Sequence, residues 1–204
     1  MLFIGDGFVN REIYVCDNEW IIAPIAEIDR TAYVELHRQI NGDGTLFLNP
    51  VCKDWMWKQV FESKDIKTFS VLNKEMSYCG SIEVQNCNSK TPELGIDLLE
   101  SKRNKGICPQ VIPMIAKKYF KENSVDYYLI RISSNNPHSI HVFEKMGAIR
   151  IQEGVSSSDS VMAAIKRVIG NDEFESMEEQ LKRKLGYQEN EVIYEYKLMP
   201  KSFL

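Results

Sequence analysis

A basic turn between an alternating segment and an amphipathic segment is the part of this sequence best suited to chemistry. Apolar residues at 94, 96 and 98 predict a strand, and apolar residues three and four positions apart between 111 and 120 predict a helix. The turn between them, residues 102–106, reads KRNKG. Such a turn directs backbone N–H groups and the positive end of the helix dipole to one point, which suits a phosphate or pyrophosphate. The alternative is an ordinary turn with solvated lysines.

A second polar stretch, residues 134–147 (SNNPHSIHVFEKMG), follows the next predicted strand at 126–133. Asn136 precedes Pro137 and can cap a helix over residues 137–146. The sequence has no G-x-x-x-x-G-K-[ST] phosphate loop, and no third glycine completes a dinucleotide-binding motif after Gly106. The basic turn therefore belongs to neither of these common nucleotide-binding loops.

Taken together, the two stretches resemble the paired signatures of the GNAT superfamily of acyl-CoA N-acyltransferases. The first signature, [QR]-x-x-G-x-[GA], corresponds to residues 103–108, and the second, N-x-x-[SA]-x-x-x-[YF]-E-K-x-G, corresponds to residues 136–147. The resemblance extends over about residues 68–153. Residues 93–95 and 143–145 look most like the branch that includes ribosomal-protein-alanine acetyltransferases.

The resemblance implies an α/β (α+β) architecture, the GNAT fold. Its mixed central sheet has about seven strands, is splayed in the middle and carries helices on both faces. Residues 1–204 would form a single such domain. The sequence adds a helical insertion at about 155–187, because two apolar stripes of helical spacing surround Gly170 and Asn171. The insertion could cover the acceptor cleft, pair with another subunit or pack on the parent domain.

The resemblance also implies an acetyl-CoA site. Backbone groups near Leu98 and Leu99 would pair with the pantetheine arm, beside a bulge in the strand at 93–99. The pyrophosphate would be held by the first signature, at Arg103, Lys105, Gly106, Ile107 and Cys108. The arm would be completed by the second signature, at Asn136, Ser139 and Phe143. Asn136 has a structural alternative as a helix cap, and Ser139 as a small first-turn residue.

Members of this family usually transfer the acetyl group directly from the thioester to an amine, within a ternary complex. We expect Glu93 to take the proton from the amine, with Glu83 as the second choice; the alternative for either is a solvated charge. We also expect the Ser139 hydroxyl to lie near the thioester sulfur. Phe143 stands where many members have a tyrosine that acts as an acid, and Cys108 stands where glycine or alanine is usual.

The sequence thus predicts an acetyl-CoA-dependent N-acetyltransferase that acts on a primary amine, either a peptide or protein N-terminus or a small-molecule amine. A rival prediction is a non-catalytic acyl-CoA-binding or interaction module of the same fold, favoured by Phe143, Cys108 and the insertion. A third is the fold without a CoA site. It rests on Pro109, which lacks an N–H donor, and on Pro113, which invites a kink in the helix.

Composition excludes some classes of partner. A net charge of −4 with mixed signs argues against a general nucleic-acid or membrane-surface binder. The five cysteines, an odd number, have no C-x-x-C spacing, and no secretory segment is recognised at the N-terminus, so reduced thiols in the cytoplasm are expected. The three histidines form no metal-ligand pattern with them, so no metal is expected. A homodimer is a further prediction.

Several elements must position these residues. Helices are expected at 30–40, where Asp29 is the predicted cap, and at 53–63. Aromatic residues at 47, 55 and 57 could contact substrate or belong to the core. Strands are expected at 20–28, 67–72 and 78–85, and again at 148–153 and 192–198. Their alternation with helices predicts the mixed sheet.

Overall fold

The computed structural model describes residues 11–40, 50–154, 166, 171, 174–176, 178–179 and 192–203. Its strands are β1 (Val15–Cys16), β2 (Trp20–Pro24), β3 (Ile66–Asn73), β4 (Tyr78–Gln85), β5 (Glu93–Leu98), β6 (Tyr128–Ser133), β7 (Ile149–Gly154) and β8 (Ile193–Leu198). Its α-helices are α1 (Arg30–Ile40), α2 (Pro50–Glu62), α3 (Cys108–Glu122) and α4 (Pro137–Lys145). The expected helical insertion lies almost wholly outside the described residues, as do the suggested role of Phe47 and that of the Trp55 side chain.

The eight strands form one mixed sheet in the order β1-β2-β3-β4-β5-β6-β8-β7. This is one strand more than expected, because the short segment Val15–Cys16 pairs with Ile21 and Ile22 at the edge. All neighbours are antiparallel except β5 and β6, which run parallel. The last strand, β8, lies between β6 and β7 rather than at the edge of the sheet.

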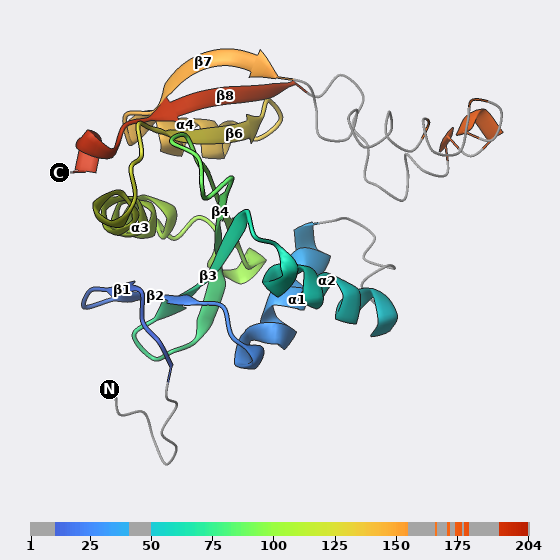
Figure 1. Ribbon diagram of the computed structural model, residues 1–204, viewed down its shortest axis with the longest axis horizontal. Helices are drawn as coiled ribbons and strands as arrows, with labels where there is room; N and C mark the ends of the chain where they lie inside the picture. Colours follow the sequence, from blue (N-terminus) through green and yellow to red (C-terminus); the bar gives the residue numbers. More distant parts are fainter. Residues whose placement is uncertain are drawn as a thin grey trace.

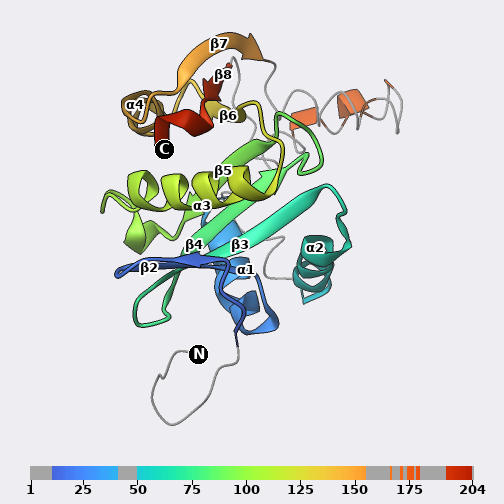
Figure 2. The ribbon, with the colours of Figure 1, turned by 60° about the vertical axis from the view of Figure 1, so that its left-hand side comes forward.

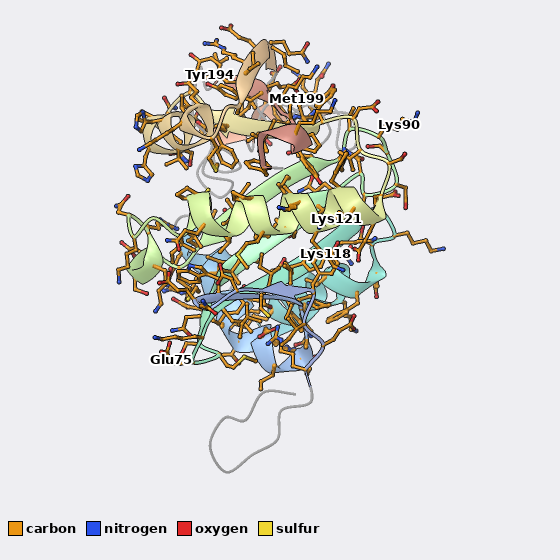
Figure 3. All side chains as sticks on the ribbon, turned by 90° about the vertical axis from the view of Figure 1, so that its left-hand side faces the viewer. Glu75, Lys90, Lys118, Lys121, Tyr194 and Met199 are labelled. Carbon is orange, nitrogen blue, oxygen red and sulfur yellow. The ribbon has the colours of Figure 1, made fainter. Side chains whose placement is uncertain are left out.

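Helices cover both faces of the sheet, as Figures 1 and 2 show. α3 and α4 lie over one face. On that face, apolar residues of β4 and β5 such as Ile82 and Leu94 pack in one buried cluster with α3. The α3 residues of this cluster include Val111, Ile112 and Ile115. Figure 3 shows α3 spanning the sheet, with Lys118 and Lys121 labelled along it. α1 and α2 lie over the opposite face, so the predicted two-faced architecture is confirmed.

α3 is continuous through Pro113. Its first residue is Cys108, so Pro109 occupies the favoured first turn and Pro113 follows four residues later. A proline at this point removes one hydrogen bond near the helix start, and the buried stripe on α3 compensates for it. The packing of the helix therefore answers the objection from Pro113, whereas Pro109 still offers no N–H donor to the loop.

Asp29 does not cap α1 as expected. It ends a 3-10 turn, Glu27–Asp29, and its carboxylate points back into the protein. There it accepts hydrogen bonds from both terminal nitrogens of Arg11, at 2.7 and 2.5 Å, from Ser70 Oγ at 2.7 Å and from the backbone N–H of Ala26 at 3.0 Å. The start of α1 is thus tied to β3 and to the N-terminal segment by one buried carboxylate.

Candidate active site

β5 and β6 separate almost as soon as they meet. Glu93 and Leu129 are their single pair among the described residues, and Leu129 N–H donates to the Pro92 carbonyl at 3.0 Å. β5 then stays on β4 in unbroken register, from Gln85 opposite Glu93 to Gly80 opposite Leu98. β6 meanwhile pairs along its whole length with β8. We call the divergence beyond the Glu93–Leu129 pair the fork, and it matches the predicted splay of the sheet.

The expected bulge in the strand at 93–99 is absent, because the β4–β5 register contains no shift. A close approach of β4 to β5 takes its place at the open end of the fork. A Cβ atom at Gly80 would lie 2.1 Å from the Asp97 carbonyl oxygen and 2.9 Å from a methyl group of Leu98. Only glycine fits there, so the end of β5 lies tightly against β4 and away from β6.

The fork exposes main-chain groups of β5. Leu99 N–H donates to the Cys79 carbonyl at 3.1 Å, so the odd-numbered residues of this segment bond to β4 and the even-numbered ones face the other way. Ile96 and Leu98 therefore direct their N–H and C=O groups into the fork. The Leu98 carbonyl already accepts from Arg103 Nε at 3.0 Å.

Leu99 was expected to help hold the pantetheine arm, but its main-chain groups are already bonded within the protein. Its N–H donates to the Cys79 carbonyl, and its carbonyl accepts from Lys102 N–H at 2.7 Å. The reason is the alternation of an antiparallel ladder, in which neighbouring residues face opposite sides. The main-chain groups of Ile96, which the sequence analysis missed, face the fork instead.

The loop at 103–108 is shaped to receive an anion. The φ angle is 59° at Asn104 and 69° at Gly106, whereas it is not positive at Lys105 and is −68° at Ile107. Backbone that alternates in this way turns successive N–H groups toward one point. None of the N–H groups from 104 to 108 has an acceptor among the residues that the structure describes. The loop continues into the N-terminus of α3, which adds the positive end of the helix dipole.

α4 closes the other side of the fork. Asn136 caps it, because its Oδ1 accepts from Ser139 N–H at 3.1 Å. The side-chain NH₂ group of Asn136 makes no hydrogen bond within the described part of the chain and can still donate. The cap role is therefore established, and the predicted contact with a pantetheine arm is compatible with it. Phe143, on the same helix, is 5% exposed and packs in the main core.

These elements enclose a cavity of about 440 Å³, which we call the cleft. Its lining comes from the end of α1, the open end of β5, the 103–108 loop and α4. Of the predicted site residues it brings together Leu98, Arg103, Cys108, Asn136, Ser139 and Phe143. Three other predicted residues, Lys105, Gly106 and Ile107, lie in the loop but do not line the cleft. Glu93 lies at the closed end of the fork.

Cys108 is the cysteine in the cleft, and burial raises the pKa of its thiol to about 12. The thiol therefore stays protonated near neutral pH and is a poor nucleophile. Ile107 is 3% exposed and belongs to the core, so it can contribute only its N–H group to the loop. Both observations favour a site that binds an acyl donor through main-chain groups over one that forms an acyl-enzyme.

The polar face of β5 offers a second approach to the fork. Glu93, Gly95 and Asp97 alternate on this face, and Gly95 and Asp97 are exposed although β5 is a central strand. A Cβ atom at Gly95 would meet no atom within 4 Å. On the neighbouring strand Glu83 accepts from the Tyr33 hydroxyl of α1 at 3.3 Å. One feature of the sequence could have indicated this exposed face: Glu93, Gly95 and Asp97 alternate with apolar residues.

Three carboxylates lie on this face, and their surroundings differ. Glu93 forms an ion pair with Arg131, at 2.9 Å between Oε2 and Nη1. Glu83 uses one oxygen for Tyr33 and the other for Gln85 Nε2, at 3.1 Å. Asp97 lines the cleft and has no hydrogen bond or ion pair within the described ranges. Of the three, Asp97 is the carboxylate free to accept a proton from a bound molecule.

The protonation of this group is set by its enclosure. Asp97 is exposed to the solvent in the cleft, but the protein atoms around its carboxyl partly desolvate it and so raise its pKa above the ordinary value of 3.8, and the charge of Glu83 adds to the rise. Burial also lowers the pKa of the His37 imidazole, which therefore stays neutral at pH 7. A carboxylate with a raised pKa beside a cavity is a common arrangement for a general base.

A family model described as an acetyltransferase (GNAT) domain matches residues 32–149. That range contains the fork, the loop and α4, and it covers more than half of the 204 residues. The chain belongs to the GNAT acetyltransferase family. The family predicted from residues 103–108 and 136–147 is thereby confirmed, and with it the enzyme class, an N-acetyltransferase. The likeness to the ribosomal-protein-alanine branch stays a prediction.

Solved structures of spermidine N-acetyltransferase from Vibrio cholerae share the fold of this GNAT protein. A dodecameric form matches with a TM-score of 0.66 at 11% identity, over 92% of this chain and 98% of that one. A complex with CoA and spermine matches with a TM-score of 0.61 at 13% identity, over 92% of this chain and 100% of that one. No curated protein sequence matches the chain.

Two further findings concern the described residues of this GNAT acetyltransferase. They contain no group of three or more histidine, cysteine, aspartate or glutamate side chains that could hold a metal ion. They also contain no helix that is both long enough and apolar enough to cross a membrane.

Proposed function

We propose that the protein transfers an acetyl group from acetyl-CoA directly to a primary amine, in a ternary complex formed in the cleft. The observation that carries this proposal is the meeting of an open fork with a loop whose N–H groups, from 104 to 108, are unused within the described chain. The loop can hold the diphosphate of CoA. The main-chain groups of Ile96 and Leu98 can pair with the pantetheine arm as a further strand.

The amine would approach from the polar face of β5, past Gly95. Once its reacting nitrogen is in the neutral form, that nitrogen attacks the thioester carbonyl carbon, the C–S bond breaks, and the sulfur leaves as the CoA thiolate. Asp97 accepts the proton that the nitrogen loses. This assignment replaces Glu93, whose carboxylate is held by Arg131. The Ile96 N–H faces the fork and is the available donor for the carbonyl oxygen as it gains charge.

No residue is needed to protonate the leaving sulfur. Phe143 cannot donate a proton, and the buried Cys108 thiol is not a strong acid. The Ser139 hydroxyl, in the cleft wall, is the nearest candidate for a hydrogen bond to the sulfur. Because a thiolate is a tolerable leaving group, the proposed reaction depends on positioning and on the base more than on an acid.

The acceptor is a primary amine on a peptide N-terminus or on a small molecule. The carboxylates of Glu83 and Asp97 beside the open space at Gly95 favour a cationic amine. The spermine bound by one structural neighbour is an amine of that kind. Location in the cytoplasm and self-association, of which the dodecameric neighbour is one example, remain predictions for this chain.

Acetyl-CoA at 100 times its Kd is expected to raise Tm by ~5 to 10 °C, because ligand binding to the folded state alone stabilises it. Gly106→Val should abolish most of that shift, since valine is strained at a φ of 69° and the loop must change shape. Differential scanning calorimetry measures both. Gly95→Ala is the matched control, because Gly95 has no positive φ and open space around it. An unchanged Tm for the wild type would contradict the proposed CoA site.

Release of free thiol in the presence of an amine panel separates an enzyme from a binding module. The panel contains peptides with free N-termini, the same peptides with blocked N-termini, and polyamines. A Tm shift without thiol release for any amine would favour the rival prediction of a non-catalytic acyl-CoA-binding module. Release with free peptides alone, or with polyamines alone, identifies the acceptor class.

Gly95→Leu should raise the KM for the acceptor by ~10- to 200-fold, the usual effect of a steric mismatch in a substrate pocket. The new side chain enters the open space on the polar face of β5, whereas the loop that holds CoA is unchanged. Steady-state kinetics with the acceptor varied at saturating acetyl-CoA measure the effect. A KM increase for acetyl-CoA instead of the acceptor would place the amine elsewhere.

A further inference from the structure

An ion network at the closed end of the fork is not used by the proposed reaction. Arg131 of β6 donates from Nη1 to Glu93 Oε2 of β5 and from Nε to Glu195 Oε1 of β8, each at 2.9 Å. The side chains of Glu93 and Glu195 are 16% and 9% exposed, and that of Arg131 is 49% exposed. Three strands are thus joined by one guanidinium.

The place of Arg131 in the sheet gives the network its significance. Glu93 and Leu129 form the single β5–β6 pair among the described residues, and Arg131 lies two residues beyond it on β6. Arg131 is also directly opposite Glu195 in the β6–β8 ladder. Its guanidinium therefore reaches from the well-paired β6–β8 side back to β5, at the point where main-chain pairing stops.

The charges in the network depend on one another. Glu195 is buried, and its second oxygen accepts from Gln152 Nε2. Burial raises the pKa of the Glu93 carboxyl, and Arg131 opposes the rise. Without the guanidinium, the carboxylates of Glu93 and Glu195 would lie on either side of β6 with no positive charge between them. Two such carboxylates repel, and β5 and β6 have no further paired residues within the described ranges to hold them together.

We infer that Arg131 is a positioning residue that sets the opening of the fork, and that Glu93 serves this ion pair instead of taking the proton from the amine. The inference rests on the proposed function. A thioester lying between β5 and β6 is held against Asp97 only if the two strands keep their separation. Arg131 does not touch the reacting atoms. It holds in place β5 and β6, the strands between which the thioester would lie.

Arg131→Met tests this. We expect kcat to fall by up to ~10²-fold, because a displacement of about an ångström is enough to misalign a bound reactant. The Kd for acetyl-CoA should change little, since the loop at 103–108 lies at the other end of β5. Arg131→Lys should recover part of the rate, because it restores the charge but not the planar guanidinium that reaches Glu93 and Glu195 at once. Arg150→Met is the control: an arginine on β7, paired with Glu153 away from the fork.

Glu93→Gln tests the claim that Glu93 does not take the proton from the amine. Unlike Arg131→Met, it leaves Glu195 paired with Arg131. It should keep the acid limb of the pH profile of kcat/KM, because Asp97 remains. The double variant Arg131→Met with Glu93→Gln should be no slower than Arg131→Met alone, since both remove the same contact. Circular dichroism spectra and Tm values for each variant separate lost folding from lost positioning.

The outcomes are distinct. Full activity of folded Arg131→Met would overturn the role of Arg131. So would a loss of rate in the double variant equal to the product of the losses in the two single variants. Loss of the acid limb in Glu93→Gln would show that Glu93 is the base and would overturn the inference as a whole. A wild-type protein that binds acetyl-CoA and transfers nothing overturns the proposed function and this inference together, so the two failures can be told apart.

Discussion

Asp97→Asn is expected to lower kcat by ~10²- to 10⁴-fold, the range that a positioned general base contributes. Asparagine has nearly the same shape but cannot accept the proton from the amine. The variant should still bind acetyl-CoA, because the proposed diphosphate site uses backbone N–H groups of the 103–108 loop and not the Asp97 side chain. Stopped-flow or coupled thiol assays at pH 7 measure kcat, and calorimetry measures the Kd for acetyl-CoA.

The pH dependence gives the same prediction a second test. Asp97 must be ionised to act as a base, so kcat/KM should fall as the pH is lowered through its pKa. Enclosure in the cleft raises that pKa above 3.8, so the acid limb should lie above the range of an ordinary aspartate. The limb should be missing in Asp97→Asn. A limb of the same shape in this variant would mean that another group takes the proton.

Glu83→Gln is the matched control for Asp97→Asn. Both oxygens of Glu83 already accept hydrogen bonds, from Tyr33 and Gln85, so its carboxylate is not free to act as the base. We expect its kcat to stay within ~10-fold of the wild type, below the range for loss of a general base. If Glu83→Gln were the more damaging of the two, the base would have to be reassigned to Glu83.

Arg11→Leu is expected to lower the free energy of unfolding by ~3–5 kcal/mol, the usual effect of removing one partner from a buried ion pair. Arg11 and Asp29 are only 7% and 4% exposed in their side chains. After the substitution the Asp29 carboxylate would keep Ser70 and the Ala26 N–H as donors but would lose its positive partner. Urea unfolding at pH 7 measures the loss.

Arg30→Leu provides the comparison, because Arg30 pairs with Glu27 and Asp54 in exposed positions at the start of α1. Exposed ion pairs contribute little, so we expect a loss of ~1 kcal/mol or less. Equal losses in the two variants would contradict the view that burial gives the Arg11–Asp29 pair its importance. A large loss for Arg11→Leu should also loosen α1, whose Gln39 lines the cleft.

Local patterns in the sequence predicted most of the elements. The helix at 30–40 and the strand at 78–85 have the predicted bounds. The strands at 93–99 and 192–198 differ by one residue at one end, and those at 67–72 and 148–153 differ by one residue at both ends. The strand at 20–28 was predicted too long, because Ile25 and Ala26 leave the sheet before the 3-10 turn. Periodicity of two or 3.6 residues is a local property, so it can be recognised in the sequence without knowledge of the fold.

In the candidate site, too, the features set by local sequence were predicted and those set by tertiary contacts were not. The two signatures identified the loop and the cap of α4, because each is a contiguous stretch whose backbone conformation depends on its own residues. The base and the strand edge could not be identified in this way. Whether Glu93, Glu83 or Asp97 is free depends on Arg131, Tyr33 and Gln85, and whether Leu98 or Leu99 faces the fork depends on Cys79 across the ladder.

The sequence by itself determined the family, most of the elements and the position of the loop at 103–108, through residue types whose effects reach only a few positions along the chain. The tertiary structure alone decided which carboxylate stays unpaired, which main-chain groups lie open in the fork, and that one arginine joins β5, β6 and β8. The physical reason is that ion pairing, burial and strand register are set by residues distant in sequence and near in space.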